Sequence, residues 1–161
     1  MPRQYLPLAA CRRHLSQRYC RARAPIEIHV ESAAIGSWHI GSPPDSRSVA
    51  VARDCGVDIS GQRARQVKSQ DFSRFDRIFG MDRANVRALR QKAPEGAHGR
   101  IHLFLHHALG QDEEVLDPYY GSEERFAAVC QTIREACEAL ATRLSERDDS
   151  ALSSGHTSST T

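Results

Sequence analysis

The chain has 161 residues, of which 40% are hydrophobic, and this suffices for the core of one domain. It contains no run of 18 or more apolar residues, so no segment is expected to cross a membrane. The five cysteines form no CxxC pair, which argues against a zinc site or a disulfide framework and favours the reducing cytoplasm. We expect neither a metal nor a cofactor.

Residues 1–25 differ in charge from the rest of the chain, because they contain six arginines and no acid. Apolar residues at helical spacing predict that residues 8–23 form a basic amphipathic helix. Such a leader is typical of a nucleic-acid arm or an organelle transit segment, and neither pattern is specific. We expect no nucleic-acid partner. The apolar positions of the leader are Leu8, Cys11, Leu15 and Tyr19.

The regular part of the chain begins at Ile26. Alternation over residues 26–30 predicts a strand, and a long glycine-bearing loop follows over residues 32–45. Ser42 is the candidate N-cap of the next helix, with two prolines in the first turn. Gly56 is expected at the C′ position of that helix.

Two further strands are predicted, over residues 75–81 and 100–105. Asp82 is expected to cap a helix after the first of them. Histidines at helical spacing over residues 98–107 suggest a metal site, but the apolar residues between them favour a buried strand with structural histidines.

A long helix is predicted from Ser122, and residues 147–161 are expected to be disordered because they have little to bury. Strands that alternate with helices predict an α/β fold, with a small parallel sheet and helices on both faces. In such folds, ligands bind at the carboxyl ends of the strands. The inward positions of the long helix are Phe126, Val129, Cys130, Ile133, Cys137, Leu140 and Leu144.

Asp117-Pro118-Tyr119-Tyr120-Gly121 is the stretch with the clearest chemistry. The proline holds Asp117 away from helical dihedrals, and the glycine permits a sharp turn. An aspartate between aromatic walls is suited to act as a general acid, because desolvation raises its pKa. The alternative is a helix N-terminal turn with two half-buried tyrosines.

Taken together, five motifs over residues 26–144 resemble the low-molecular-weight protein-tyrosine phosphatases. The resemblance implies the phosphotyrosine phosphatase I-like fold and phosphomonoester hydrolysis through a cysteinyl-phosphate, without metal. It implies phosphotyrosine proteins or small aryl phosphates as substrates. The motifs are Val30-Glu31-Ser32-Ala33-Ala34, Gly36-Ser37-Trp38-His39-Ile40-Gly41 with Pro43-Pro44-Asp45, Arg63-Ala64-Arg65-Gln66-Val67, Met81-Asp82-Arg83-Ala84-Asn85-Val86 and Asp117-Pro118-Tyr119-Tyr120.

The resemblance also assigns roles to individual residues. Asp117 matches the general acid that protonates the leaving oxygen and then activates water. Trp38 matches the aromatic rim of the substrate cleft, and Tyr119 and Tyr120 match its opposite wall. Ser32 matches the serine that orders the phosphate loop. The structural alternatives are that the three aromatic residues cover edges of the core and that Ser32 is a turn serine at the end of a strand.

The sequence departs from the family at the catalytic loop, in which the nucleophilic cysteine and an arginine have the spacing C-x5-R, because no segment before Ile26 contains such a loop. Cys137 and Arg143 have the C-x5-R spacing, but they lie in a predicted helix without glycine, where backbone N–H groups cannot hold an anion. We therefore expect no nucleophile, no first central strand, and an inactive polypeptide as written. Arsenate reductase on the same fold, or a non-catalytic binding remnant, are the rival functions.

A frame shift would explain the leader. Read one base later, the codons of Met1 and Pro2 force a cysteine, and the following codons can spell C-x-G-N-I-C-R-S-P-x-A-E-G. We therefore divide the chain into an atypical leader over residues 1–25, a phosphatase-like domain over residues 26–146 and a tail over residues 147–161.

Overall fold

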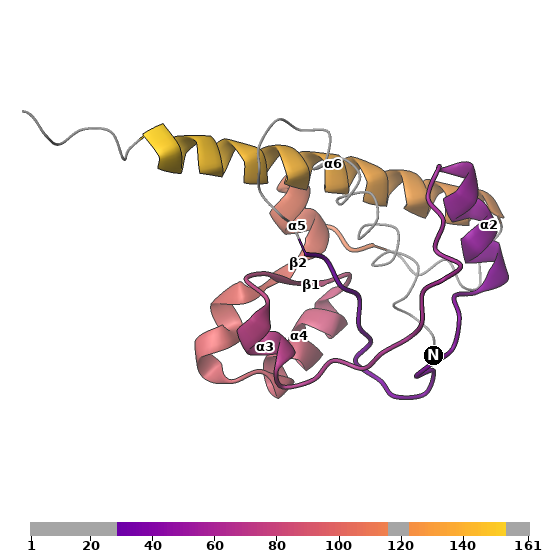
Figure 1. The fold of residues 1–161 in the computed structure, drawn as a ribbon, viewed down its shortest axis with the longest axis horizontal. Helices are drawn as coiled ribbons and strands as arrows, with labels where there is room; N and C mark the ends of the chain where they lie inside the picture. The colour runs from indigo at the N-terminus through magenta and orange to yellow at the C-terminus, as the bar shows by residue number, and fades with distance from the viewer. Residues whose placement is uncertain (1–28, 116–122, 154–161) are drawn as a thin grey trace, which may run out of the picture.

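The computed structural model describes residues 29–115 and 123–153. Helices lie on both sides of two short parallel strands (Figure 1), so the predicted α/β class is confirmed. The elements, in chain order, are α2 (Ser46–Asp54), α3 (Asp71–Arg74), β1 (Ile78–Gly80), α4 (Arg83–Lys92), the 3-10 helix η1 (Glu95–Arg100), β2 (Ile101–Leu103), α5 (Phe104–Leu109) and α6 (Glu123–Ser153).

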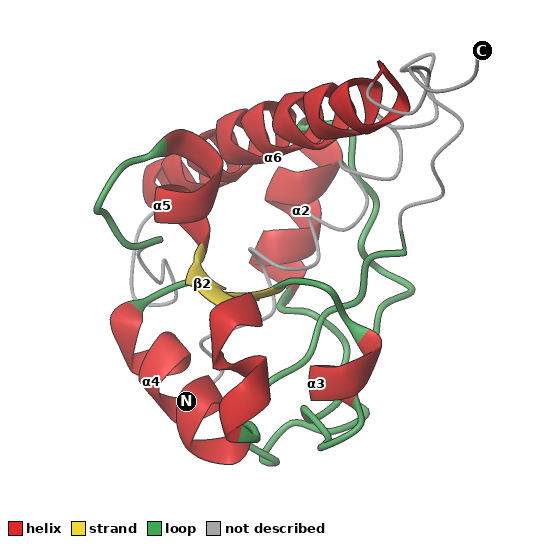
Figure 2. Cartoon of the chain, turned by 90° about the vertical axis from the view of Figure 1, so that its left-hand side faces the viewer, coloured by secondary structure: helices red, strands yellow, loops and turns green. Residues whose placement is uncertain are grey.

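The described sheet consists of β1 paired in parallel with β2. Ile78 stands opposite Ile101, and Gly80 stands opposite Leu103. Helices α5 and α6 lie on one side of these strands, and α3 and α4 lie on the other (Figures 1 and 2). Because residues 1–28 lie outside the described part of the chain, the missing central strand stays a prediction.

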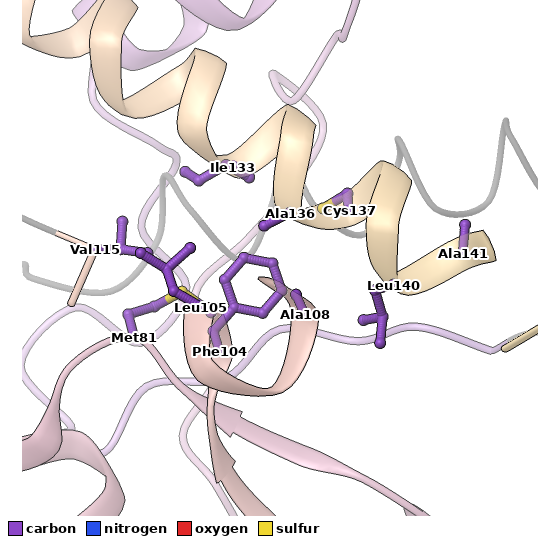
Figure 3. Close-up of a cluster of buried hydrophobic side chains, with 10 residues drawn as sticks. All are labelled: Met81, Phe104, Leu105, Ala108, Val115, Ile133, Ala136, Cys137, Leu140 and Ala141. Carbon is purple, nitrogen blue, oxygen red and sulfur yellow. The ribbon is translucent and has the colours of Figure 1, made fainter. Parts of the chain in front are cut away.

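The largest cluster of buried side chains, the α5–α6 cluster, lies between α5 and α6 (Figure 3). Phe104 and Leu105 begin α5 and point toward Ile133 and its neighbours on α6, and Phe104 is fully buried. Met81, at the end of β1, packs into the same cluster. Its buried members are Met81, Phe104, Leu105, Ala108, Val115, Ile133, Ala136, Cys137, Leu140 and Ala141.

Two smaller clusters complete the described core. The α2–α6 cluster contains Ala52, Val57, Ile59 and Phe126, so α6 contributes to two clusters. The α3–α4 cluster lies on the opposite side of the strands and contains Phe72, Leu89, Ala97 and Ile101.

The cap predicted for α2 is wrong. The helix begins at Ser46 rather than near Ser42, and its N-cap is Asp45, whose carboxylate accepts a hydrogen bond from the Arg47 N–H. Proline disfavours helical dihedrals in the residue before it, and this keeps the Pro43-Pro44 pair outside the helix. Gly56 does follow the C-cap with φ +77°, as predicted.

The predicted strands are longer than the observed ones. β2 ends at Leu103, and Phe104 and Leu105 start α5 instead of extending the strand. β1 begins only at Ile78, and residues 29 and 30 are not in a strand. The apolar run itself suits a strand or a helix. Burial of Phe104 and Leu105 against α6 selects the helix.

Helix α6 confirms the long helix, with Phe126, Cys130, Ile133, Cys137 and Leu140 all buried. It extends to Ser153, and the expected disorder of residues 147–161 stays a prediction. No glycine or proline occurs between Gly121 and Gly155 to end the helix. Among the described residues, none of the helices combines the length and apolarity that a membrane crossing requires.

Candidate active site

The loop that carries Trp38 is held at its carboxyl-terminal end by residue 64. The Gly41 N–H donates to the Ala64 carbonyl at 2.8 Å, and the Ala64 N–H donates to the Ser42 carbonyl at 3.0 Å. Gly41 has φ +80°, a conformation that favours glycine. The turn therefore has a fixed base and projects its tip outward.

Trp38 lies at the tip of this loop and is 77% exposed. A Cβ atom on Gly36 would lie 2.0 Å from Trp38 Cζ3, so the indole packs directly on the glycine backbone. Ile40 is also exposed, and the two are the large exposed hydrophobic residues in the described part of the chain. An exposed aromatic ring of this kind is available to contact a ligand.

The Ser32 segment passes between the two sides of the fold and runs beside residues 65–67. Val30 packs against the α5–α6 cluster, whereas Ile35 packs against the α3–α4 cluster. Ala34 forms a parallel bridge with Gln66, whose side-chain amide donates to the Ile35 carbonyl at 3.0 Å. The structure thus brings together two motifs that are about 30 residues apart in the sequence. Ser32, two residues before Ala34, is half-buried.

Arg65 joins the residue before Ser32 to helix α3. Its guanidinium lies 2.8 Å from a Glu31 carboxylate oxygen and 2.8 Å from an Asp71 carboxylate oxygen. Arg74 and His29 also contact Glu31, at 3.0 Å and 2.7 Å. This arrangement of two acids around one arginine, the Arg65 network, was not predicted from the sequence.

The pKa values in the Arg65 network favour its charged form. Hydrogen bonding to His29 lowers the pKa of Glu31 more than burial raises it, and Arg65 and Arg74 lower it further. Burial raises the pKa of Asp71, but hydrogen bonds from Arg65 and from the Lys68 N–H outweigh burial and lower it overall. Both carboxylates are therefore ionised at neutral pH.

Asp82 stands at the carboxyl end of β1 and caps α4, as predicted, by accepting a hydrogen bond from the Asn85 N–H. Gly80, two residues earlier, has no room for a side chain, because a Cβ there would lie 2.9 Å from the Val86 nitrogen. The turn from β1 into α4 is consequently tight. The Asp82 side chain has a structural role here.

The segment that leads toward residue 117 is fastened at this same end of β1. The Val115 N–H donates to the Met81 carbonyl at 2.9 Å. Arg83 donates from its backbone to Glu114 at 3.0 Å, and its guanidinium lies 2.8 Å from Asp112. The hydrogen bond that the Arg83 guanidinium donates to Glu114 raises the pKa of Arg83. Sequence reasoning missed this clamp, because its partners are about 30 residues apart.

The remaining predicted site residues, Asp117, Tyr119 and Tyr120, lie outside the described residues. The expectation that Asp117 shares one space with Trp38, Asp82 and Ser32 therefore stays a prediction.

The described cysteines are Cys55, Cys130 and Cys137. Cys137, the cysteine with an arginine six residues later, is fully buried in the middle of α6. The guanidinium of Arg143 donates to the His107 carbonyl at 2.8 Å. This pair is part of helix packing and does not form an anion-binding loop.

The histidines of the 98–107 region pack against other groups. His98 lies 2.9 Å from the Arg90 carbonyl oxygen, and the rings of His102 and His107 have centroids 4.4 Å apart. Burial lowers the pKa of His102, and nearby Arg77 and Arg90 lower it further. Within the described ranges, no group of three or more His, Cys, Asp or Glu side chains is arranged to hold a metal ion.

Comparisons of the sequence and of the fold with known proteins identify the same family. Residues 8–150 match the family described as low molecular weight phosphotyrosine protein phosphatase. The chain belongs to this family. The predicted resemblance is thereby confirmed, and the match extends on both sides of residues 26–144.

Individual members of the family show the extent of the similarity. The Bacillus subtilis low molecular weight protein-tyrosine-phosphatase YfkJ is 39% identical over 115 residues, which cover 71% of this chain and 72% of that protein. A protein tyrosine phosphatase from Entamoeba histolytica, solved with Hepes in its active site, superposes with a TM-score of 0.77 at 30% identity and 91% coverage of both chains. Vibrio vulnificus Wzb, solved in complex with benzylphosphonate, has a TM-score of 0.70 at 33% identity, covering 84% of this chain and 88% of its own.

Proposed function

We propose that this phosphatase-family chain recognises phosphotyrosine in proteins, or small aryl phosphates, but lacks a nucleophile and does not hydrolyse them as written. In this proposal Asp117 is the general acid, and Trp38, Tyr119 and Tyr120 line the substrate cleft. Ser32 supports the position where the phosphate loop of the family would lie. The proposed compartment is the cytoplasm, where thiols stay reduced, and no metal, cofactor, membrane or nucleic acid takes part.

The burial of Cys137 carries the proposal of inactivity. Covalent phosphoryl transfer needs a thiolate inside a loop whose N–H groups and arginine hold the phosphate oxygens. Cys137 alone among the five cysteines has an arginine six residues later, and its side chain is fully buried in α6. No cysteine in this sequence therefore meets both requirements.

The hydrogen bond between Val115 and Met81 supports the proposed role of Asp117 as the general acid. Asp117 lies two positions after Val115, and two residues of extended chain span at most about 7 Å. Val115 is bonded to Met81 at the carboxyl end of β1, where ligands bind in folds of this class. Wzb binds benzylphosphonate, which carries both an aromatic ring and a phosphonate. This supports an aryl phosphate as the ligand of the present chain.

Hydrolysis of p-nitrophenyl phosphate tests the proposal. The purified 161-residue protein should show no turnover above the buffer background, while YfkJ assayed beside it serves as the positive control. Acid–base help from Asp117 alone contributes only about 10²–10⁴-fold, too little for detectable turnover without a nucleophile. Turnover that thiol alkylation abolishes would overturn the proposal, and Cys→Ala variants would then identify the nucleophile.

The nucleotide sequence of the locus tests the origin of the leader. If residues 1–25 are a frame-shifted reading, the other frame encodes the run C-x-G-N-I-C-R-S without a stop codon. A frame-corrected, N-terminally extended protein should then hydrolyse the substrate, and Asp117→Asn in it should slow leaving-group departure by about 10²–10⁴-fold. A stop codon in that frame, or an in-frame family loop directly upstream of Met1, would refute the frame shift.

The exposure of Trp38 allows the proposed binding to be tested separately from hydrolysis. Trp38 is the single tryptophan of the chain and is 77% exposed, so its fluorescence reports on the cleft rim. Titration with phenylphosphonate should change this fluorescence in the 161-residue protein and not in a Tyr119→Ala, Tyr120→Ala variant. An unchanged signal in both proteins would exclude binding at the rim.

A further inference from the structure

Two thiols that no catalytic role uses lie together where α2 meets α6. Cys55 is the C-cap residue of α2, and Cys130 lies in the second turn of α6. They are 75 positions apart in the chain, yet the Cys130 thiol lies 2.8 Å from the Cys55 sulfur. A disulfide bond requires a sulfur separation of about 2 Å, so the two atoms need to approach by less than about 1 Å.

The surrounding packing holds the two sulfur atoms at this distance. Ala52, three residues before Cys55, and Phe126, four residues before Cys130, are both buried in the α2–α6 cluster. The Cys55 N–H donates to the Val51 carbonyl at 3.1 Å, and this fixes the end of α2. The pairing therefore follows from two helices that are already in contact.

The two thiols differ in access to solvent. Cys130 is buried, with 6% of its surface exposed, whereas Cys55 is half-buried. Burial and the hydrogen bond with Cys55 raise the pKa of Cys130 to about 12, so its thiol stays protonated at neutral pH. Reaction with a dissolved oxidant accordingly begins at Cys55.

We propose that Cys55 and Cys130 form a reversible disulfide that links α2 to α6 when low-molecular-weight disulfides such as oxidised glutathione accumulate. The Cys55 thiolate attacks one sulfur of the oxidant, forms a mixed disulfide and releases one glutathione thiolate. Cys130 then attacks the Cys55 sulfur and releases the second glutathione, which takes up the proton of Cys130. The protein loses two electrons and two protons in total, and glutathione disulfide is reduced to two thiols.

The disulfide closes a loop that contains β1, α4, β2 and α5. Cross-links across long loops remove conformational freedom from the unfolded chain and so stabilise the folded one. A loop of this length raises the midpoint of thermal unfolding by about 10 °C in a chain of this size. This property is independent of the phosphatase chemistry and persists in a catalytically silent protein.

Peptide mapping without reduction tests the proposal directly. The full-length protein is incubated with oxidised glutathione and then digested with trypsin, which cleaves after Arg53, Arg63, Arg125 and Arg134. The expected product joins residues 54–63 to residues 126–134 and is two hydrogen atoms lighter than the two free peptides. Cys137 falls in a different peptide, residues 135–143, so the digest distinguishes the two cysteines of α6.

Variants provide the controls. Cys55→Ala and Cys130→Ala should each lose both the joined peptide and the gain of about 10 °C. A Cys11→Ser, Cys20→Ser variant should keep both and then lose them on addition of dithiothreitol. The proposal is overturned if only glutathione adducts of Cys55 form, if Cys55 pairs with another cysteine, or if the joined peptide brings no change in thermal midpoint.

Discussion

Replacement of Arg65 by alanine tests whether the Arg65 network holds the Ser32 segment in place. The change removes two 2.8 Å contacts, one to Glu31 and one to Asp71. The side chain of Arg65 is 30% exposed, that of Glu31 18% and that of Asp71 11%. These ion pairs therefore lie between the surface and the buried cases. Exposed pairs contribute under about 1 kcal/mol and broken buried pairs cost about 3–5 kcal/mol, which places Arg65→Ala near about 2 kcal/mol.

The pH dependence of stability shows whether the Arg65 network acts through charge. The pKa values of Glu31 and Asp71 are lowered from their usual 4.5 and 3.8 in the folded protein. Their contribution is therefore complete above about pH 5 and is lost as the pH falls through the lowered values. The stability difference between the native protein and Arg65→Ala should shrink below about pH 4, because both carboxylates become protonated.

Urea unfolding followed by circular dichroism measures this difference, and the loss of about 2 kcal/mol corresponds to about 4–8 °C in thermal midpoint. Arg63→Ala is the matched control, because Arg63 donates to the nearby carbonyls of Ser60 and Gln62 in an exposed turn. It should change stability by less than about 0.5 kcal/mol. A difference for Arg65→Ala that stays constant or grows from pH 7 to pH 3 would refute the electrostatic reasoning.

Three further changes probe the packing around the candidate site. Asp82→Ala removes the cap of α4 and should cost about 1 kcal/mol in urea unfolding, while Asp82→Asn should retain most of the stability. Gly80→Ala places a Cβ 2.8 Å from Val86 Cγ2 and 2.9 Å from its nitrogen, and should cost about 1–3 kcal/mol. Gly96→Ala, which meets nothing within 4 Å, is its control, and equal effects of the two changes would contradict the clash. Phe104→Ala empties the centre of the α5–α6 cluster and should cost about 3–5 kcal/mol; a loss below about 1 kcal/mol would show that the side chain is not fully packed.

The fold was predictable where local chemistry and burial agree. Asp82 precedes a helical pattern and satisfies one of its free N–H groups, so position and role both follow from the sequence. The apolar positions of α6 repeat at helical spacing, and Phe126, Ile133 and Leu140 are accordingly buried.

The errors occurred where more than one structure, or more than one residue, suits the same local pattern. The apolar run that ends in Phe104 and Leu105 suits a strand or a helix, and packing against α6 selects the helix. Asp45 competes with Ser42 for the cap of α2 and wins because it lies after the prolines and binds both the backbone and guanidinium of Arg47.

For the candidate site, the sequence motifs name the residues, and the roles of Trp38 and Ser32 stay predictions because Asp117, Tyr119 and Tyr120 lie outside the described residues. The partners of Arg65 and Arg83 could not be predicted, because Glu31 and Glu114 are each about 30 residues away and no local pattern relates them. Charge pairs of this kind depend on the whole fold.

The position of α6 after the other described helices in the sequence has a consequence for synthesis on the ribosome. Helix α6 supplies Phe126 to the α2–α6 cluster and Ile133, Ala136 and Leu140 to the α5–α6 cluster. Until these residues leave the exit tunnel, the apolar faces of α2 and α5 lack the side chains that α6 supplies to the described core. A nascent chain stalled before residue 141 therefore exposes two unfilled apolar surfaces at once, and chaperones should retain it until translation resumes.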